Sequence, residues 1–110
     1  MTMGTVSVGD IGTPIVLTCS DGTAVESIAG ATTIEVILLR PGGTPGTGVA
    51  RTAELVTDGT DGQLRYTTVV GDIDVDGVWK VSARVVLASG VDREFQDPGA
   101  TFVARRRLRA

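Results

Sequence analysis

Residues 71–87 read Gly71-Asp-Ile-Asp-Val-Asp-Gly-Val-Trp-Lys-Val-Ser-Ala-Arg-Val-Val-Leu87, an acidic turn followed by an alternating run. Apolar side chains occupy every second position from Trp79 to Leu87, whereas Lys80 and Arg84 occupy positions between them. Successive side chains of a β-strand point to opposite faces of the sheet. The run therefore predicts a half-buried antiparallel strand with Trp79 on its buried face.

The rest of the chain repeats this pattern of short alternating runs separated by Asp, Gly and Pro. We expect strands at about 13–20, 32–40, 49–57, 63–70, 78–87, 91–96 and 100–105, and the pattern also allows a short strand at 5–8. Short strands at this regular spacing are typical of a sandwich. The sequence predicts an all-β fold, an antiparallel immunoglobulin-like β-sandwich of about seven strands.

The length of 110 residues fits one domain. We assign residues 1–104 to the sandwich and residues 105–110 to a basic C-terminal tail. A single cysteine, Cys19, cannot form a disulfide within the chain, and its alternation with Ile15 and Leu17 predicts a buried thiol. No apolar run approaches the 18 or so residues that a membrane-spanning helix needs, so we expect no membrane partner.

Charge is distributed unevenly along the chain. Residues 1–104 hold six basic and thirteen acidic side chains, a net charge of −7, and four arginines follow at Arg105, Arg106, Arg107 and Arg109. Two interpretations of this tail remain open, a solvated terminus and a contact with an acidic surface of a neighbouring subunit. Nucleic acid is not an expected partner, because the acidic body repels phosphate and no basic patch is interleaved with aromatic residues.

The strand expected at 32–40 is apolar on both faces near its end, where Ile37 and Leu39 alternate with Val36 and Leu38. Such a strand is either central in its sheet or meets a partner on one face. Ile37 and Leu39 are therefore candidate partner-binding residues, together with the four arginines. The Pro41–Gly48 segment that follows is expected to be an exposed loop.

The acidic turn Asp72-x-Asp74-x-Asp76-Gly77 resembles the opening of a calcium-binding loop. Lys80 and Ala83 stand where that loop needs a ligand and a bidentate glutamate, so we expect a structural turn without a metal. Tyr66 precedes this turn, and we expect its hydroxyl to hydrogen-bond to the backbone across the sandwich, as corner tyrosines do.

The composition disfavours catalysis. The chain has no histidine, which removes the commonest general base and the commonest zinc ligand. The one cysteine has no activating partner in the sequence, and the glycine-rich loop lacks the lysine of a phosphate-binding loop. We expect a protein that is not an enzyme and that binds no cofactor.

Six short motifs occur in a recognisable order along residues 8–104. They are Gly9-Asp-Ile-Gly12, Asp21-Gly22, Val25-Glu-Ser-Ile-Ala-Gly-Ala-Thr-Thr33, Asp61-Gly-Gln-Leu-Arg-Tyr66, Gly71-Asp-Ile-Asp-Val-Asp-Gly-Val-Trp79 and Phe95-Gln-Asp-Pro98. In these motifs the chain resembles the small immunoglobulin-like modules of tailed-bacteriophage virion proteins, which include the N-terminal domain of the baseplate upper protein family and related tail-fibre proteins.

This resemblance implies a structural protein located in the virion. It would be a small adaptor in the tail, baseplate or fibre-attachment region that binds other virion proteins and is repeated as a homo-oligomer or symmetric assembly. A second interpretation is a capsid decoration, or cement, protein on the major capsid lattice. A carbohydrate-binding module is less favoured, because the chain holds only one Trp, one Tyr and two Phe for stacking on sugars.

Overall fold

The computed structural model describes residues 2–20, 24–44, 46–95, 101–106 and 108. These residues form nine β-strands and no helix. The strands are β1 (Thr2–Ser7), β2 (Pro14–Thr18), β3 (Thr33–Leu39), β4 (Val49–Thr52), β5 (Glu54–Leu55), β6 (Gln63–Thr67), β7 (Gly77–Val86), β8 (Asp92–Phe95) and β9 (Thr101–Arg105). The described residues thus offer no helix that could cross a membrane.

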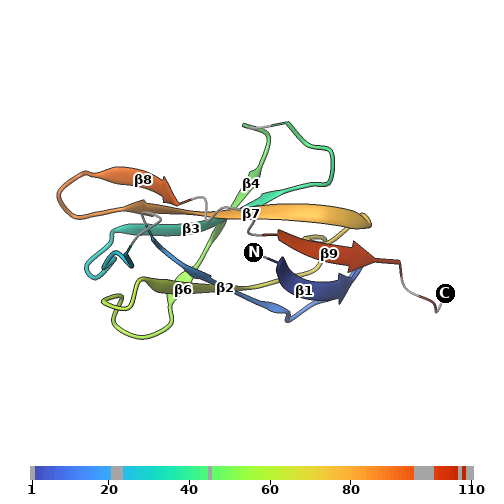
Figure 1. Ribbon diagram of the computed structural model, residues 1–110, viewed down its shortest axis with the longest axis horizontal. Coiled ribbons are helices and arrows are strands. Elements are labelled where there is room, and N and C mark those ends of the chain that lie inside the picture. Colours follow the sequence, from blue (N-terminus) through green and yellow to red (C-terminus); the bar gives the residue numbers. More distant parts are fainter. Residues whose placement is uncertain (1, 21–23, 45, 96–100, 107, 109–110) are drawn as a thin grey trace.

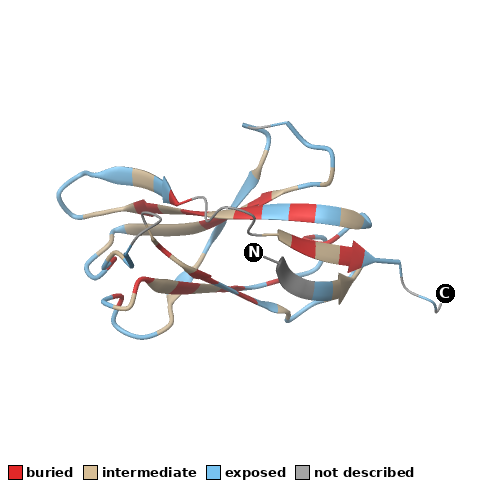
Figure 2. Ribbon diagram, in the orientation of Figure 1, coloured by how far each residue is buried: buried red, intermediate tan, exposed pale blue. Residues whose placement is uncertain are grey.

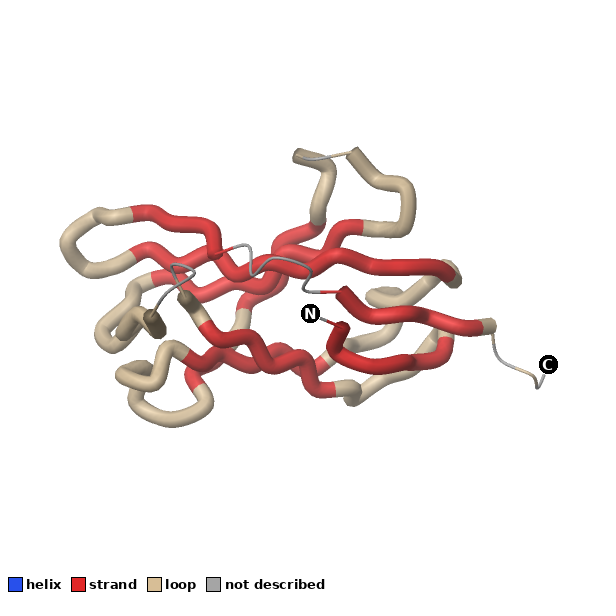
Figure 3. The backbone as a smooth tube through the Cα atoms, in the orientation of Figure 1, coloured by secondary structure: helices blue, strands red, loops and turns tan. Residues whose placement is uncertain are grey.

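The strands form two sheets that pack face to face (Figures 1 and 3). The large sheet has the order β1-β9-β7-β3-β4, and the small sheet has the order β2-β6-β5. The long strand β7 pairs with β9 along its first half and with β8 along its second half. The predicted all-β sandwich is confirmed.

Two features of the topology differ from the sequence prediction. The run expected as one strand at 49–57 divides into β4, which pairs with β3 in the large sheet, and β5, which pairs with β6 in the small sheet. The chain changes sheets at Ala53, whose amide donates to the Ile34 carbonyl at 2.9 Å. The N-terminal strand β1 is longer than expected and pairs with β9 in parallel, so the sandwich is not wholly antiparallel.

The core fills the space between the sheets. Trp79 is 2% exposed, its indole ring stacks on Phe102 with 5.8 Å between ring centroids, and its Nε1 donates to the Val75 carbonyl at 3.1 Å. Along β7, buried residues alternate with exposed or intermediate ones, as predicted (Figure 2). Cys19 is fully buried, and burial, with a smaller contribution from the charge of Glu26, raises the pKa of its thiol to about 11.

Candidate functional site

The side of the large sheet that faces away from the small sheet is called the outer face below. On β7 the even-numbered residues from Val78 to Val86 point to this face, because Trp79, Val81 and their odd-numbered neighbours are buried. Directly opposed residues on adjacent strands share a face. The strand register therefore identifies the other side chains of the outer face.

One half of the outer face is apolar and basic. Lys80 lies between Leu39 on β3 and Thr101 on β9, and in the next row Val78 lies beside Val103. Arg105 follows two positions after Val103 on the same strand and is exposed. Val78 is 52% exposed. We call Leu39, Val78, Lys80, Val103 and Arg105 the basic half.

The other half of the outer face is acidic. Arg84 donates to Glu35 on β3 at 2.7 Å and to Asp92 on β8 at 2.8 Å, and Glu94 is its register partner on β8. Hydrogen bonds from Arg84 to these carboxylates, that to Asp92 first, raise the pKa of the guanidinium above its ordinary value. We call Glu35, Arg84, Asp92 and Glu94 the acidic half. Three carboxylates around one guanidinium give this half a net negative charge.

Unmatched positive charge is confined to a small region of the described structure. The body contains six basic residues. Five of them form ion pairs, namely Arg40 with Asp74, Arg51 with Asp72, Arg65 with Glu54, Arg84 with Glu35 and Asp92, and Arg93 with Glu26. Lys80 is the sixth, and no described carboxylate forms an ion pair with it or with Arg105. The charges left for a partner in the described residues therefore lie in the basic half.

Ile37 and Leu39 both lie on the outer face and are half-buried. The strand β3 that carries them is central, between β7 and β4. The β3–β4 loop approaches them closely, since a Cβ atom built at Gly48 would lie 2.6 Å from Ile37 Cγ2 and one at Gly43 would lie 2.9 Å from Leu39 Cδ1. Close packing of this loop against Ile37 and Leu39 therefore accounts for part of the apolar character of the strand, and this part needs no partner protein to explain it.

Arg105 belongs to the last strand, in agreement with the strand expected at 100–105. Arg105, assigned to the tail, is the last residue of β9, where it is the register partner of Ser7 and its carbonyl accepts the Val8 amide at 2.8 Å. The Arg106 side chain is 85% exposed, with its Nε 3.7 Å from Asp76 Oδ2. Arg107 and Arg109 lie outside the described residues.

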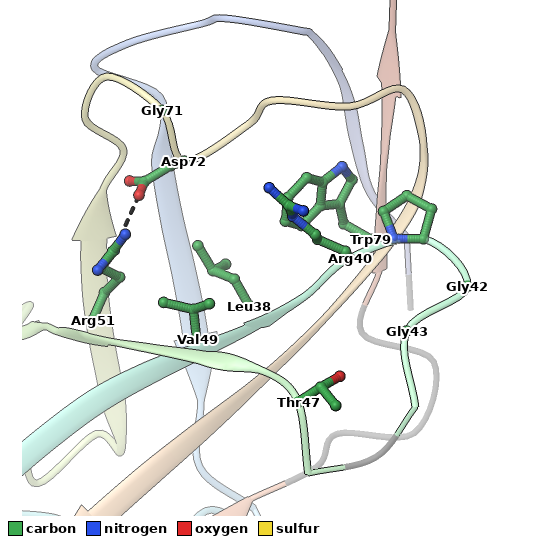
Figure 4. Close-up of a pocket in the computed structure, with 11 residues that line it drawn as sticks. Leu38, Arg40, Gly42, Gly43, Thr47, Val49, Arg51, Gly71, Asp72 and Trp79 are labelled. Carbon is green, nitrogen blue, oxygen red and sulfur yellow. Dashed lines mark hydrogen bonds and ion pairs between the residues drawn. The ribbon is translucent and has the colours of Figure 1, made fainter.

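A groove of about 490 Å³ lies at the edge of the sandwich, between β4 and the β6–β7 loop (Figure 4). Leu38, Val49 and Trp79 supply its apolar lining, and Arg40 and Arg51 supply polar groups. Both arginines are already paired, Arg40 with Asp74 and Arg51 with Asp72. The groove therefore offers shape and apolar surface but little free charge.

The buried carboxylate of Asp72 ties this edge together. Its side chain is 0% exposed and accepts hydrogen bonds from the Tyr66 hydroxyl, from the Val69 amide at 2.8 Å and from Arg51 Nε at 3.0 Å. Burial alone would raise the pKa of Asp72, but the hydrogen bonds from these three donors and the charge of Arg51 hold the pKa below its ordinary value. Burial first, and then the bond to Asp72, raise the pKa of Tyr66 to about 12.

This arrangement corrects the expectation for Tyr66. A corner tyrosine was expected to bond directly to the backbone, whereas the Tyr66 hydroxyl donates to Asp72, and Asp72 in turn accepts the backbone amide of Val69. The three carboxylates of the acidic turn have separate partners, since Asp74 pairs with Arg40 and Asp76 with Arg106. The part of the chain that the structure describes holds no group of three or more His, Cys, Asp or Glu residues placed for a metal ion.

Sequence reasoning missed an exposed apolar end formed by two loops. Ile11, Val69 and Val70 are 65%, 51% and 80% exposed. Their loops are joined by Thr68, whose carbonyl accepts the Gly12 amide at 2.8 Å and whose amide donates to the Thr13 carbonyl at 3.0 Å. The strand predicted at 63–70 therefore ends at Thr67, and the valines counted as strand residues lie in a turn. This end also carries the end of β9 (Figure 1).

No known family model and no curated protein matches the chain. Among solved structures, the fold is similar to that of CopC from Methylosinus trichosporium OB3b, with a TM-score of 0.52 and 14% sequence identity over 97% of this chain and 87% of that chain. At this identity the similarity shows a shared β-sandwich fold and nothing about function.

Proposed function

We propose that this protein is a small, non-enzymatic structural adaptor of a tailed-bacteriophage virion, placed in the tail, baseplate or fibre-attachment region, where it binds other virion proteins. The observation that carries this proposal is the basic half of the outer face. There Lys80 and Arg105 lack acidic partners among the described residues and lie beside the exposed side chain of Val78.

The physical argument is one of complementarity. Exposed apolar side chains gain free energy when a partner removes them from water. Unpaired cations that flank them steer an acidic partner and set its orientation. The other cations of the described body are paired within the chain, so a partner that needs a cation elsewhere would have to break an existing ion pair. The order of sequence motifs typical of virion modules indicates the kind of particle in which such an adaptor works.

The first experiment locates the protein in the particle. Virions of a phage that encodes this chain are purified, dissociated into heads and tails, and each fraction is analysed by mass spectrometry. We expect the chain in the tail fraction at a copy number set by the tail symmetry. Recovery with heads would support the capsid decoration function instead, and absence from both fractions would overturn the proposal.

The second experiment tests the basic half. Lys80→Ser and Arg105→Ser together remove its two charges, and Arg65→Ser is the matched control, because Arg65 lies on β6 of the small sheet and pairs with Glu54. We expect the double variant to enter particles poorly, while the control enters normally. Equal incorporation of both variants would show that the contact lies elsewhere. Binding of the intact protein should also weaken as salt rises, because exposed charges are screened over about 8 Å at physiological ionic strength.

A further inference from the structure

We propose that the acidic partner of the basic half is the acidic half of a second copy of this chain, bound through the outer face of the large sheet, and that this dimer is the unit repeated in the particle. The inference rests on the proposed function only for its setting, because the dimer itself is argued from the two halves of the face. The basic half carries Lys80 and Arg105, and the acidic half carries three carboxylates around Arg84. The face is therefore complementary to itself.

The register of β7 shows how the two copies would align. On one side of β7, β9 flanks the first half of the strand and β8 flanks the second half. Consider a two-fold axis that lies in the interface and runs perpendicular to the strands. This rotation reverses the direction of the strands in the second copy, but it leaves the strands that flank β7 on the same side of β7. It therefore places β9 of each copy over β8 of the other. If Arg105 lies over Asp92 of the second copy, the antiparallel register places Val103 over its Glu94.

The same operation fixes the orientation of the dimer. By symmetry each copy supplies one basic half and one acidic half, so the complementary contact is made twice. Stacking the two faces with their strands parallel, with the axis along β7, would place basic half over basic half and acidic half over acidic half. Juxtaposed like charges of this kind disfavour an interface strongly. The antiparallel arrangement is the one that the charges select.

The size and composition of the face are sufficient for such an interface. The molecule measures 48 × 24 × 22 Å along its principal axes, and β7 spans ten residues of the large sheet. A rectangle of 48 × 24 Å is an upper limit on the area of this face, and it exceeds the 800 Å² or so per partner that stable interfaces bury. Val78 and Val103 in the basic half, and the half-buried Ile37, provide apolar contact. A second copy would cover them and pair the unmatched cations.

The experiment measures self-association of the full chain by sedimentation equilibrium. At about 100 μM and low salt we expect a dimer, because a dimer with micromolar Kd is mostly associated at that concentration. Raising the salt should weaken the dimer, since its orientation depends on exposed charges. A wild-type protein that stays monomeric under these conditions would overturn the inference, while its presence in virion tails would still support the proposed function.

A charge exchange tests the geometry. One variant carries Lys80→Glu and Arg105→Glu, so both halves of its face are acidic, and the other carries Asp92→Lys and Glu94→Lys, so both halves are basic. Each variant alone should associate at least about 100-fold more weakly than wild type, because like charges then oppose one another. An equimolar mixture should form a heterodimer.

Folding of each variant is checked by circular dichroism and by its melting temperature. Arg65→Glu serves as the control, since it alters charge on the small sheet and should leave the dimer unchanged. A mixture that remains monomeric while both variants are folded would refute the antiparallel alignment. Normal association of either variant alone would refute the role of the two halves.

Discussion

The buried carboxylate of Asp72 provides the sharpest test of how this sandwich is held together, and the perturbation is Asp72→Ala. The substitution removes the acceptor of the Tyr66 hydroxyl and of the Val69 amide, and it releases Arg51. A buried donor left without a partner costs about 1–3 kcal/mol. Arg51 is 43% exposed and can turn to water, so its loss adds about 0.5 kcal/mol. The two donors and the ion pair together give an expected loss of about 2.5–6.5 kcal/mol, a large part of the stability of a small domain.

The assay is urea denaturation followed by the fluorescence of Trp79, the single tryptophan. Asp72→Ala, Tyr66→Phe and the double variant form a cycle, and we expect a coupling of about 1–2 kcal/mol between the two side chains because they share a buried hydrogen bond. Asp74→Ala is the matched control on the same loop. Its ion pair with Arg40 is exposed, so we expect a loss below about 1 kcal/mol.

The pH dependence of stability gives an independent measure of the same group. The pKa of Asp72 is lowered in the folded state, so its stabilisation is present above the unfolded value of about 3.9 and is lost as pH falls from there through the folded pKa. Asp72→Asn should show a smaller acid loss than wild type. If Asp72→Ala cost no more than the Asp74→Ala control, or if the acid transition were unchanged in Asp72→Asn, the reasoning on this buried group would be refuted.

Four further outcomes are expected. Trp79→Ala should cost about 3–5 kcal/mol in the same urea assay, because it leaves a large cavity in the core, and a loss under 1 kcal/mol would place the indole outside the core. Cys19 should not react with a thiol reagent at pH 8 unless urea is added, since the thiol is buried and its pKa is about 11; rapid labelling of folded protein would contradict this. Stability should fall as pH rises from about 10 towards 12, because the folded pKa of Tyr66 is about 12 against an unfolded value of about 10, and Tyr66→Phe should reduce that loss. Calcium and excess chelator should give the same melting temperature, because Asp72, Asp74 and Asp76 have separate protein partners, and a drop with chelator would restore the metal site.

The sequence predicted the strands well where alternation and turn residues coincide. The run after Gly77 forms β7 with Trp79 buried, and the strand ending at Leu39 forms β3. It did not predict the change of sheet at Ala53, because a strand that leaves one sheet for another keeps its alternation and shows no break in composition. It also did not predict the parallel pairing of β1 with β9, which joins the two ends of the chain. Long-range pairing of that kind leaves no local signal.

The sequence predicted some residues of the candidate site, but it did not show that they lie on one face. Leu39 and Arg105 were proposed for separate reasons, and the register of β3, β7 and β9 places them on one face. Lys80 was recognised as an outward residue of its strand but not as a site residue. Lys80 became a candidate because no described carboxylate pairs with it, whereas the other basic residues of the body are paired. Those pairings can be seen only in the three-dimensional structure.

The ion pairs within the chain relate the fold to the proposed binding surface. In the described part of the body each arginine contacts a carboxylate, several of them across strands, so these pairs help to fix the register and leave little for a partner. Lys80 stands on the outer face without such a pair, in a row between Leu39 and Thr101. If that lysine served only solubility, Lys80→Ser would leave both self-association and incorporation into particles unchanged. Because Lys80 lies beside the exposed Val78 and is opposite in sign to the acidic half of the same face, we expect both self-association and incorporation to fall.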